Sequence, residues 1–278
     1  MKEIILGAFA DEAGYYIDDQ IEVMEANGIR NLEARSIGGR NFVDFTVSEA
    51  QELKEKLDAH GLRLWSVGSP LGKINITDAM EPHLDKLKHT LELANVMGSE
   101  CIRMFSFFIP EGEADTYRDE VMERLSRMVE AANGSGVMLC HENEKGIYGE
   151  TAARCAEILQ CFPQMGGIFD PANFIQCGEE TLPAWELLKD RIRYMHIKDC
   201  LADGQVVPCG KGVGHLPEIL ASFIALGGDQ LTLEPHLTVF PGLENLEPAD
   251  RKTKIDAFAY PSRRAAFDAA VAALRACL

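Results

Sequence analysis

Four residues whose side chains commonly bind metal ions lie at or just after the ends of apolar, β-rich runs. These residues are Glu142, Asp170, His196 and Glu234. They are 28, 26 and 38 residues apart, and each interval is about the length of one strand–helix unit. Three carboxylates and one imidazole suit a divalent cation such as Mn²⁺, Mg²⁺, Co²⁺ or Zn²⁺. Without a cation the carboxylates would repel one another, so the pattern predicts a centre for one divalent metal ion.

The elements that must position these side chains alternate between short apolar runs and helical patterns. The predicted strands span residues 4–10, 31–34, 62–67, 101–108, 137–141, 165–169, 192–197 and 231–233. They are apolar throughout rather than alternating, which is typical of a parallel sheet covered by helices. Eight strand–helix units in 278 residues predict a (β/α)8 TIM barrel of the α/β class, with an open doubly wound sheet as the competing architecture.

The composition is that of a folded, soluble chain. Apolar residues make up 46% and charged residues 26%, and no linker or change of composition divides the sequence, so we predict one domain over residues 1–278. The first apolar run is too short for a signal peptide, and no stretch approaches the roughly 18 apolar residues of a membrane-spanning helix. The eight cysteines form no C-x-x-C pair, which favours free thiols in a cytoplasmic protein.

The charge balance disfavours one class of partner. Asp and Glu number 44 against 27 Lys and Arg, which gives a net charge of −17. A field of this sign repels phosphodiester backbones, so we expect no nucleic acid and no membrane among the partners. The sequence leaves open whether the chain forms a homo-oligomer.

Other polar residues near the predicted strand ends are candidates for binding a substrate. They are Glu33, Lys73, Arg103, Lys198 and His236. Arg103 and the lysines can hold a carboxylate, a phosphate or sugar hydroxyls. The alternative for Arg103 is an ion pair with Glu33 inside the barrel, which would make it structural. His141 directly precedes Glu142 on a strand and is expected to point the other way.

Two loops near the predicted active-site rim also stand out. The glycine-rich run at 210–214 lacks the spacing of a phosphate-binding loop, so a lid or a plain turn is expected there. The longest irregular stretch, residues 238–254, follows the eighth predicted strand, where a barrel places its active-site loops.

The chain resembles the sugar phosphate isomerase/epimerase family of xylose isomerase-like TIM barrels, which is grouped with AP endonuclease family 2. The resemblance covers essentially the whole chain. Its most specific stretches are Glu142-Asn143, Asp170-Pro171-Ala172-Asn173, His196-Ile197-Lys198-Asp199 and Leu233-Glu234-Pro235.

The resemblance implies roles for individual residues. It implies that the four residues of the predicted metal centre are ligands, and that Glu142 and Glu234 are also the catalytic acid/base pair. The related epimerases usually have a histidine three residues after the aspartate. This chain has Asn173 at that position, and we include it among the candidate substrate-binding residues.

The predicted function is a metal-dependent isomerase or epimerase of a small polyhydroxy carbonyl compound, either a sugar or a sugar phosphate. One glutamate would remove a proton beside the carbonyl to give a cis-enediolate, and the other would return a proton. The alternative is a lyase that uses the same site to dehydrate a keto-inositol or a keto-sugar. An apurinic endonuclease is less favoured, because few histidines lie at strand ends and the chain is acidic.

Overall fold

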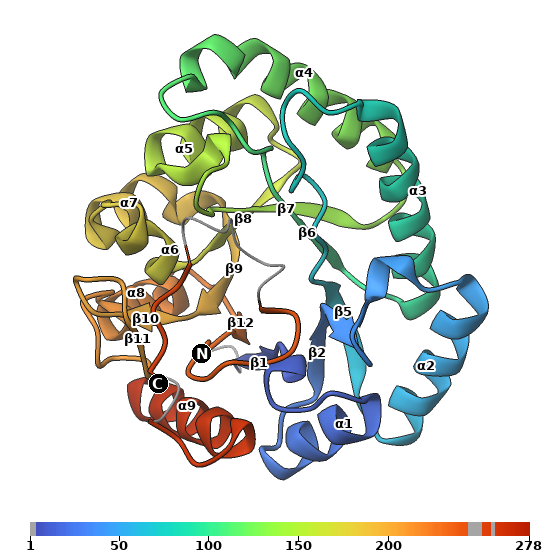
Figure 1. Ribbon diagram of the computed structural model, residues 1–278, viewed down its shortest axis with the longest axis vertical. Coiled ribbons are helices and arrows are strands. Elements are labelled where there is room, and N and C mark those ends of the chain that lie inside the picture. The colour runs from blue at the N-terminus through green and yellow to red at the C-terminus, as the bar shows by residue number, and fades with distance from the viewer. Residues whose placement is uncertain (1–3, 244–251, 257–258) are drawn as a thin grey trace.

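Eight parallel strands close into a barrel in the computed structural model, which describes residues 4–243, 252–256 and 259–278 (Figure 1). The strands are β1 (Ile5–Ala8), β2 (Asn31–Ala34), β5 (Arg63–Val67), β6 (Cys101–Met104), β7 (Met138–Glu142), β8 (Gly166–Phe169), β9 (Ile192–Ile197) and β12 (Gln230–Leu233). Each strand pairs with the next one along the chain, and β12 returns to pair with β1. The predicted (β/α)8 barrel is therefore confirmed, and the open sheet was the wrong alternative.

Helices surround the strands as a ring (Figure 1). They are α1 (Ile17–Ala26), α2 (Val47–Ala59), α3 (Met80–Met97), α4 (Ala114–Ala132), α5 (Ala152–Cys161), α6 (Pro171–Gln176), α7 (Thr181–Leu188), α8 (Leu216–Ala225) and α9 (Arg263–Cys277). The last helix packs beside the first, since Asn27 donates a 2.7 Å hydrogen bond to Asp268. Among the described residues, no helix is long and apolar enough to cross a membrane.

Short elements fill the connections. The two-stranded hairpins are β3 (Ser36–Ile37) with β4 (Arg40–Asn41), and β10 (Asp199–Cys200) with β11 (Val206–Val207). The 3-10 turns are η1 (Ala10–Glu12), η2 (Phe42–Asp44), η3 (Tyr148–Glu150) and η4 (Lys189–Arg191). Both hairpins follow a barrel strand directly, so they lie on the rim where the strands end.

Large side chains fill the barrel beneath that rim. Trp65 of β5 and Tyr194 of β9 come from opposite sides of the barrel, and their ring centroids lie 4.7 Å apart in an edge-to-face contact. Together with Cys101, Cys140 and Ile168 they form a buried cluster. This part of the barrel interior is therefore a packed core.

Two predicted strands are shorter than the sequence suggested. The first ends at Ala8, and the chain turns into η1, which carries Asp11 and Glu12. The fourth ends at Met104, and Phe107 three residues later has a positive φ of 68°. Apolar side chains continue past both strands because the following loops are also buried. Of the predicted loop 238–254, residues 244–251 lie outside the described part of the chain.

Candidate metal centre

The ends of four consecutive barrel strands bring four potential ligands together. Glu142 ends β7, Asp170 follows β8, His196 is the fifth residue of β9, and Glu234 follows β12. All four are buried, and one ligand atom from each lies within 4.8 Å of the others. Parallel strands in a barrel end on the same rim, which explains how residues so far apart in sequence meet. The structure thus gathers the residues selected from the sequence, and their role as ligands stays a prediction.

The imidazole of His196 lies between the two glutamates. Its Nδ1 is 2.9 Å from Glu142 Oε1 and 3.3 Å from Glu234 Oε2. Burial alone would lower the pKa of His196, but Glu142, Glu33 and Glu234 outweigh burial and raise this pKa well above its ordinary value. Without a bound cation His196 is therefore protonated, and its positive charge offsets part of the negative charge of the carboxylates.

Glu33 lies under His196 rather than on the open rim. Its Oε2 is 3.3 Å from His196 Nε2, and its Oε1 accepts hydrogen bonds from Tyr194 at 2.8 Å and Ser66 at 3.3 Å. The side chain is fully buried. These contacts suit a residue that fixes the tautomer and orientation of the His196 ring, leaving Nδ1 toward the cluster. The sequence had selected Glu33 as a substrate contact, and none of these contacts supports that role.

Two arginines hold the outer oxygens of the two glutamates. Arg103 Nη1 lies 3.1 Å from Glu142 Oε2, and Arg35 Nη1 lies 2.9 Å from Glu234 Oε1. The other oxygen of each carboxylate faces His196. Each carboxylate is therefore oriented by one charge-assisted hydrogen bond on its outer side. Arg103 also lies 3.6 Å from Glu234, so its close ion pairs among the described residues are with the candidate ligands rather than with Glu33.

The two predicted lysines have different positions. Lys198 lies inside the cluster, with Nζ 2.8 Å from Asp170 Oδ2 and 3.3 Å from Glu234 Oε2. Lys73 lies further out, where its Nζ is 3.2 Å from Glu144 Oε2 and 4.4 Å from the centroid of the Phe105 ring. Lys198 is thus a neighbour of the candidate ligands, and Lys73 belongs to the surrounding rim.

Asp170 and Asn173 lie at the start of α6 and are fixed by its N-terminal hydrogen bonds. Asp170 is the N-cap of this helix, and its Oδ1 accepts a 3.0 Å hydrogen bond from the Asn173 amide. The Asn173 side chain donates to the Asn143 carbonyl at 2.9 Å and to Glu142 Oε1 at 3.4 Å. Asn173 therefore ties the loop after β7 to the loop after β8, and a substrate contact by this residue stays a prediction.

His236 lies beside a group of residues that sequence reasoning missed. Its Nε2 is 3.5 Å from an oxygen of Glu12, and its backbone amide donates to Glu12 at 2.8 Å. Burial raises the pKa of Glu12 to about 8 and lowers the pKa of His236 to about 4. Asp11 and Glu12 follow the first predicted apolar run, residues 4–10, and Arg35 directly follows β2, so the strand-end rule could have selected all three.

The glycine-rich run encloses a carboxylate of the chain itself. Asp199 accepts hydrogen bonds of 2.9–3.0 Å from the backbone amides of Gly210, Gly212, Gly214 and Cys200. A Cβ on Gly212 would collide with this carboxylate, which explains why glycine is required there. The amides that could bind a phosphate are thus occupied, and the run forms a closed turn around Asp199.

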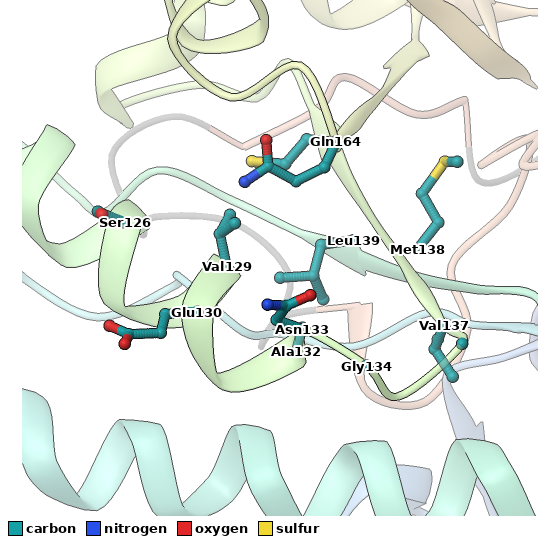
Figure 2. Close-up of a pocket in the computed structure, with 12 residues that line it drawn as sticks. Ser126, Val129, Glu130, Ala132, Asn133, Gly134, Val137, Met138, Leu139 and Gln164 are labelled. Carbon is teal, nitrogen blue, oxygen red and sulfur yellow. The ribbon is translucent and has the colours of Figure 1, made fainter.

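A separate cavity of about 600 Å³ lies at the other end of the barrel (Figure 2). Its lining includes Val129 and Glu130 of α4, together with Met138, the first residue of β7. Glu142 is the last residue of the same strand, so the cavity and the candidate metal centre lie at opposite ends of β7. The cavity is therefore no part of this centre.

Comparison with known proteins agrees with the fold. A family model described as xylose isomerase-like TIM barrel matches residues 20–252, and the chain belongs to this family. The structure of an L-ribulose 3-epimerase is similar with a TM-score of 0.72 and 16% identity, covering 100% of this chain and 95% of the other. The IolI protein with a bound zinc atom gives 0.73 and 16%, covering 99% and 98%.

A third similar structure is a probable 3-DHS dehydratase, AsbF, from Bacillus anthracis. Its TM-score is 0.68 at 16% identity, and the match covers 84% of this chain and 92% of the other. None of the curated proteins compared with the chain matches it. At these identities the structural matches establish the fold, and the chemistry has to be argued from the residues of this chain.

Proposed function

We propose that this member of the xylose isomerase-like barrel family is a divalent-metal-dependent isomerase or epimerase of a small polyhydroxy carbonyl compound, a sugar or a sugar phosphate. The observation that carries the proposal is the buried cluster of three carboxylates and one imidazole on the barrel rim. The likeness to an L-ribulose 3-epimerase agrees with it.

The residues fit a divalent ion. Glu142, Asp170, His196 and Glu234 would hold it, since three carboxylate oxygens and one imidazole nitrogen are a common donor set for Mn²⁺, Mg²⁺, Co²⁺ and Zn²⁺. An ion bound there polarises a carbonyl and the adjacent hydroxyl, and so acidifies the C–H bond between them.

We propose that Glu142 and Glu234 are the acid/base pair that transfers protons at the substrate carbons. They contact His196 Nδ1 from two different strands, β7 and β12, so they approach the reacting carbons from different sides. One glutamate would remove the proton to leave an enediolate, and the other, itself protonated, would donate its own proton to the opposite face or to the neighbouring carbon. Although burial raises the pKa of Glu234, Lys198 and His196 lower it well below its ordinary value, so Glu234 stays ionised in the metal-free protein.

Positioning of the substrate is proposed for Arg103 and Lys198, with Lys73, Asn173 and His236 around them. Arg103 supports this role because its Nε has no hydrogen-bond partner among the described residues, although the residue is only 4% exposed. A free, buried donor beside the reacting centre can bind a substrate oxygen. Correct orientation by such groups contributes more to rate than affinity alone.

Deuterium exchange tests the proposal directly. The protein is loaded with Mn²⁺ or Co²⁺, incubated with a panel of ketoses in D₂O, and the exchange of C–H protons beside the carbonyl is followed by NMR. We expect exchange with at least one ketose, and its loss in both Glu142→Gln and Glu234→Gln. Metal-loaded protein that exchanges no substrate proton, or a Glu234→Gln variant with full exchange, would refute the assignment.

A lyase is the second candidate, favoured by the similarity to a probable dehydratase. The same proton removal followed by loss of a β-hydroxyl would dehydrate a keto-inositol or a keto-sugar. The two reactions differ in the mass of their products. Dehydration removes one water and leaves an unsaturated carbonyl, whereas isomerisation keeps the mass of the substrate. Mass spectrometry of the products separates them.

A further inference from the structure

A second group of potential ligands adjoins the candidate metal centre and shares Glu234 with it. Ligand atoms of Glu12, Glu234 and His236 lie within 4.8 Å of one another, and all three residues are buried. His236 Nε2 is 3.5 Å from Glu12 Oε1 and 3.5 Å from Glu234 Oε1. Neither ring nitrogen of His236 has a hydrogen-bond partner among the described residues, although the residue is 3% exposed.

Two of the distances in this second group are compatible with a cation site. A separation of 3.5 Å is longer than an ordinary hydrogen bond. Two atoms that each bind one ion at about 2.0–2.2 Å stand about 2.8–3.6 Å apart. At these two distances His236 and its two carboxylate neighbours are close enough to share a second divalent ion.

The guanidinium of Arg35 already forms ion pairs with the carboxylates of Glu12 and Glu234. Its Nη1 lies 2.9 Å from Glu234 Oε1, and its Nη2 lies 3.5 Å from Glu12 Oε1. These are the same two oxygens that face His236. Arg35 thus contributes one fixed positive charge at the oxygens that a second ion would need.

Arg35 cannot easily leave this position. Asp11 accepts two hydrogen bonds from it, Nε to Oδ2 and Nη2 to Oδ1, both of 2.9 Å. The guanidinium carbon lies 4.5 Å from the ring centroid of Phe9 and 5.0 Å from that of Phe240. A bidentate ion pair and aromatic contacts hold a planar guanidinium in a defined place, which a lysine ammonium would not reproduce.

We propose that Arg35 is the permanent cation of this second group, and that it keeps the centre to a single divalent ion while it positions Glu234. The inference rests on the proposed role of Glu234 as a metal ligand. Arg35 holds Oε1, so Oε2 faces His196 and Lys198, each at 3.3 Å. Arg35 therefore leaves only Oε2 of Glu234 for the proposed centre, and a second ion would have to displace Arg35 from Oε1.

Counting bound metal tests this inference without an activity assay. Protein saturated with Co²⁺ at millimolar concentration is dialysed and its cobalt content is measured by elemental analysis. The test variant combines Arg35→Met with Asp11→Asn, so that the ion pair is removed as a unit and no unpaired Asp11 charge remains buried. We expect one ion in the wild type and two in this variant. Adding His236→Ala to the variant should return the count to one.

Two single variants serve as controls. Arg35→Lys keeps a cation and should keep one ion, and His236→Ala in the wild-type background should leave the count at one. Two ions in the wild type, loss of an ion in His236→Ala alone, or one ion in a folded Asp11→Asn, Arg35→Met variant would each overturn the role of Arg35. If that variant fails to fold, the single variant Arg35→Gln takes its place: two ions are expected, and one ion in the folded protein would overturn the role of Arg35. A wild type that binds no ion would instead refute the metal centre, and this inference with it.

Discussion

Replacing Glu33 by glutamine should weaken metal binding, although Glu33 is not a candidate ligand. The carboxylate accepts from the Nε2 side of His196 at 3.3 Å, and thereby leaves Nδ1 for the metal. A hydrogen bond to a charged group contributes about 1.5–3 kcal/mol, against about 0.5–1.5 kcal/mol for a neutral pair. Glu33→Gln should therefore cost about 1–2 kcal/mol, which is about a 5- to 30-fold loss of metal affinity.

The pH dependence of that loss has a definite sign. His196 must release its proton to bind a metal, and Glu33 is one of the carboxylates that raise the pKa of His196 against the effect of burial. Glu33→Gln lowers this pKa and so weakens the competition by protons. The affinity loss should therefore be largest at high pH, where His196 is already deprotonated in both proteins, and smaller at low pH.

Competition with a chromophoric chelator at several pH values measures both effects. Tyr194→Phe is the matched control, since it removes the 2.8 Å hydrogen bond to Glu33 and leaves the contact between Glu33 and His196. We expect a smaller loss of affinity in the control. Unchanged metal affinity together with a raised KM in Glu33→Gln would refute the reasoning, and would show that Glu33 contacts the substrate, as the sequence suggested.

Four further outcomes are expected. Glu234→Gln should lower metal affinity by at least about 100-fold, beyond the effect typical of outer partners, while circular dichroism shows an intact barrel. Metal affinity of the wild type, measured by titration, should fall by about tenfold per pH unit below the raised pKa of His196, and by about 100-fold per unit below about pH 7, where Asp170 also binds a proton; a flat profile would contradict proton competition. Asp199→Ala leaves four amides without their acceptor and should cost about 2–4 kcal/mol in denaturant unfolding, whereas Asp203→Ala, at an exposed position of the same loop, should cost little. Arg103→Met should raise KM or lower kcat about tenfold in the metal-loaded protein, with some loss of Tm because Glu142 loses a buried partner; a large drop in Tm with preserved kinetics would make Arg103 structural.

The sequence predicted the barrel and the gathering of four polar residues because both follow from simple periodicity. Apolar runs mark buried parallel strands, and the residue that ends each run falls on a common rim. Glu142 and Glu234 illustrate this, since each lies at the last strand position or directly after it. No knowledge of side-chain direction was needed to place them together.

The surroundings of the centre could not be predicted in the same way, because they depend on contacts between loops. The sequence places Asp11 and Glu12 after the first apolar run, but it does not show that the η1 turn brings them against His236 and Arg35. The pairing of β2 with β5 changes register between Leu32 and Glu33, and strand alternation does not foresee such a shift. The sequence also did not show which group the amides of the glycine run bind. Their acceptor is Asp199, which lies 11 to 15 residues earlier in the chain.

The buried charges around the candidate metal centre predict what happens when an ion binds. Six buried carboxylates surround the centre: Asp11, Glu12, Glu33, Glu142, Asp170 and Glu234. Three permanent cations face them: Arg35, Arg103 and Lys198. Without a metal the remaining negative charge is met by protons, since burial raises the pKa of Asp170 to about 7 and that of Glu12 to about 8, and the carboxylates keep His196 protonated. A divalent ion would replace the protons on Asp170 and His196, so metal binding should release protons into solution in proportion to the ion bound.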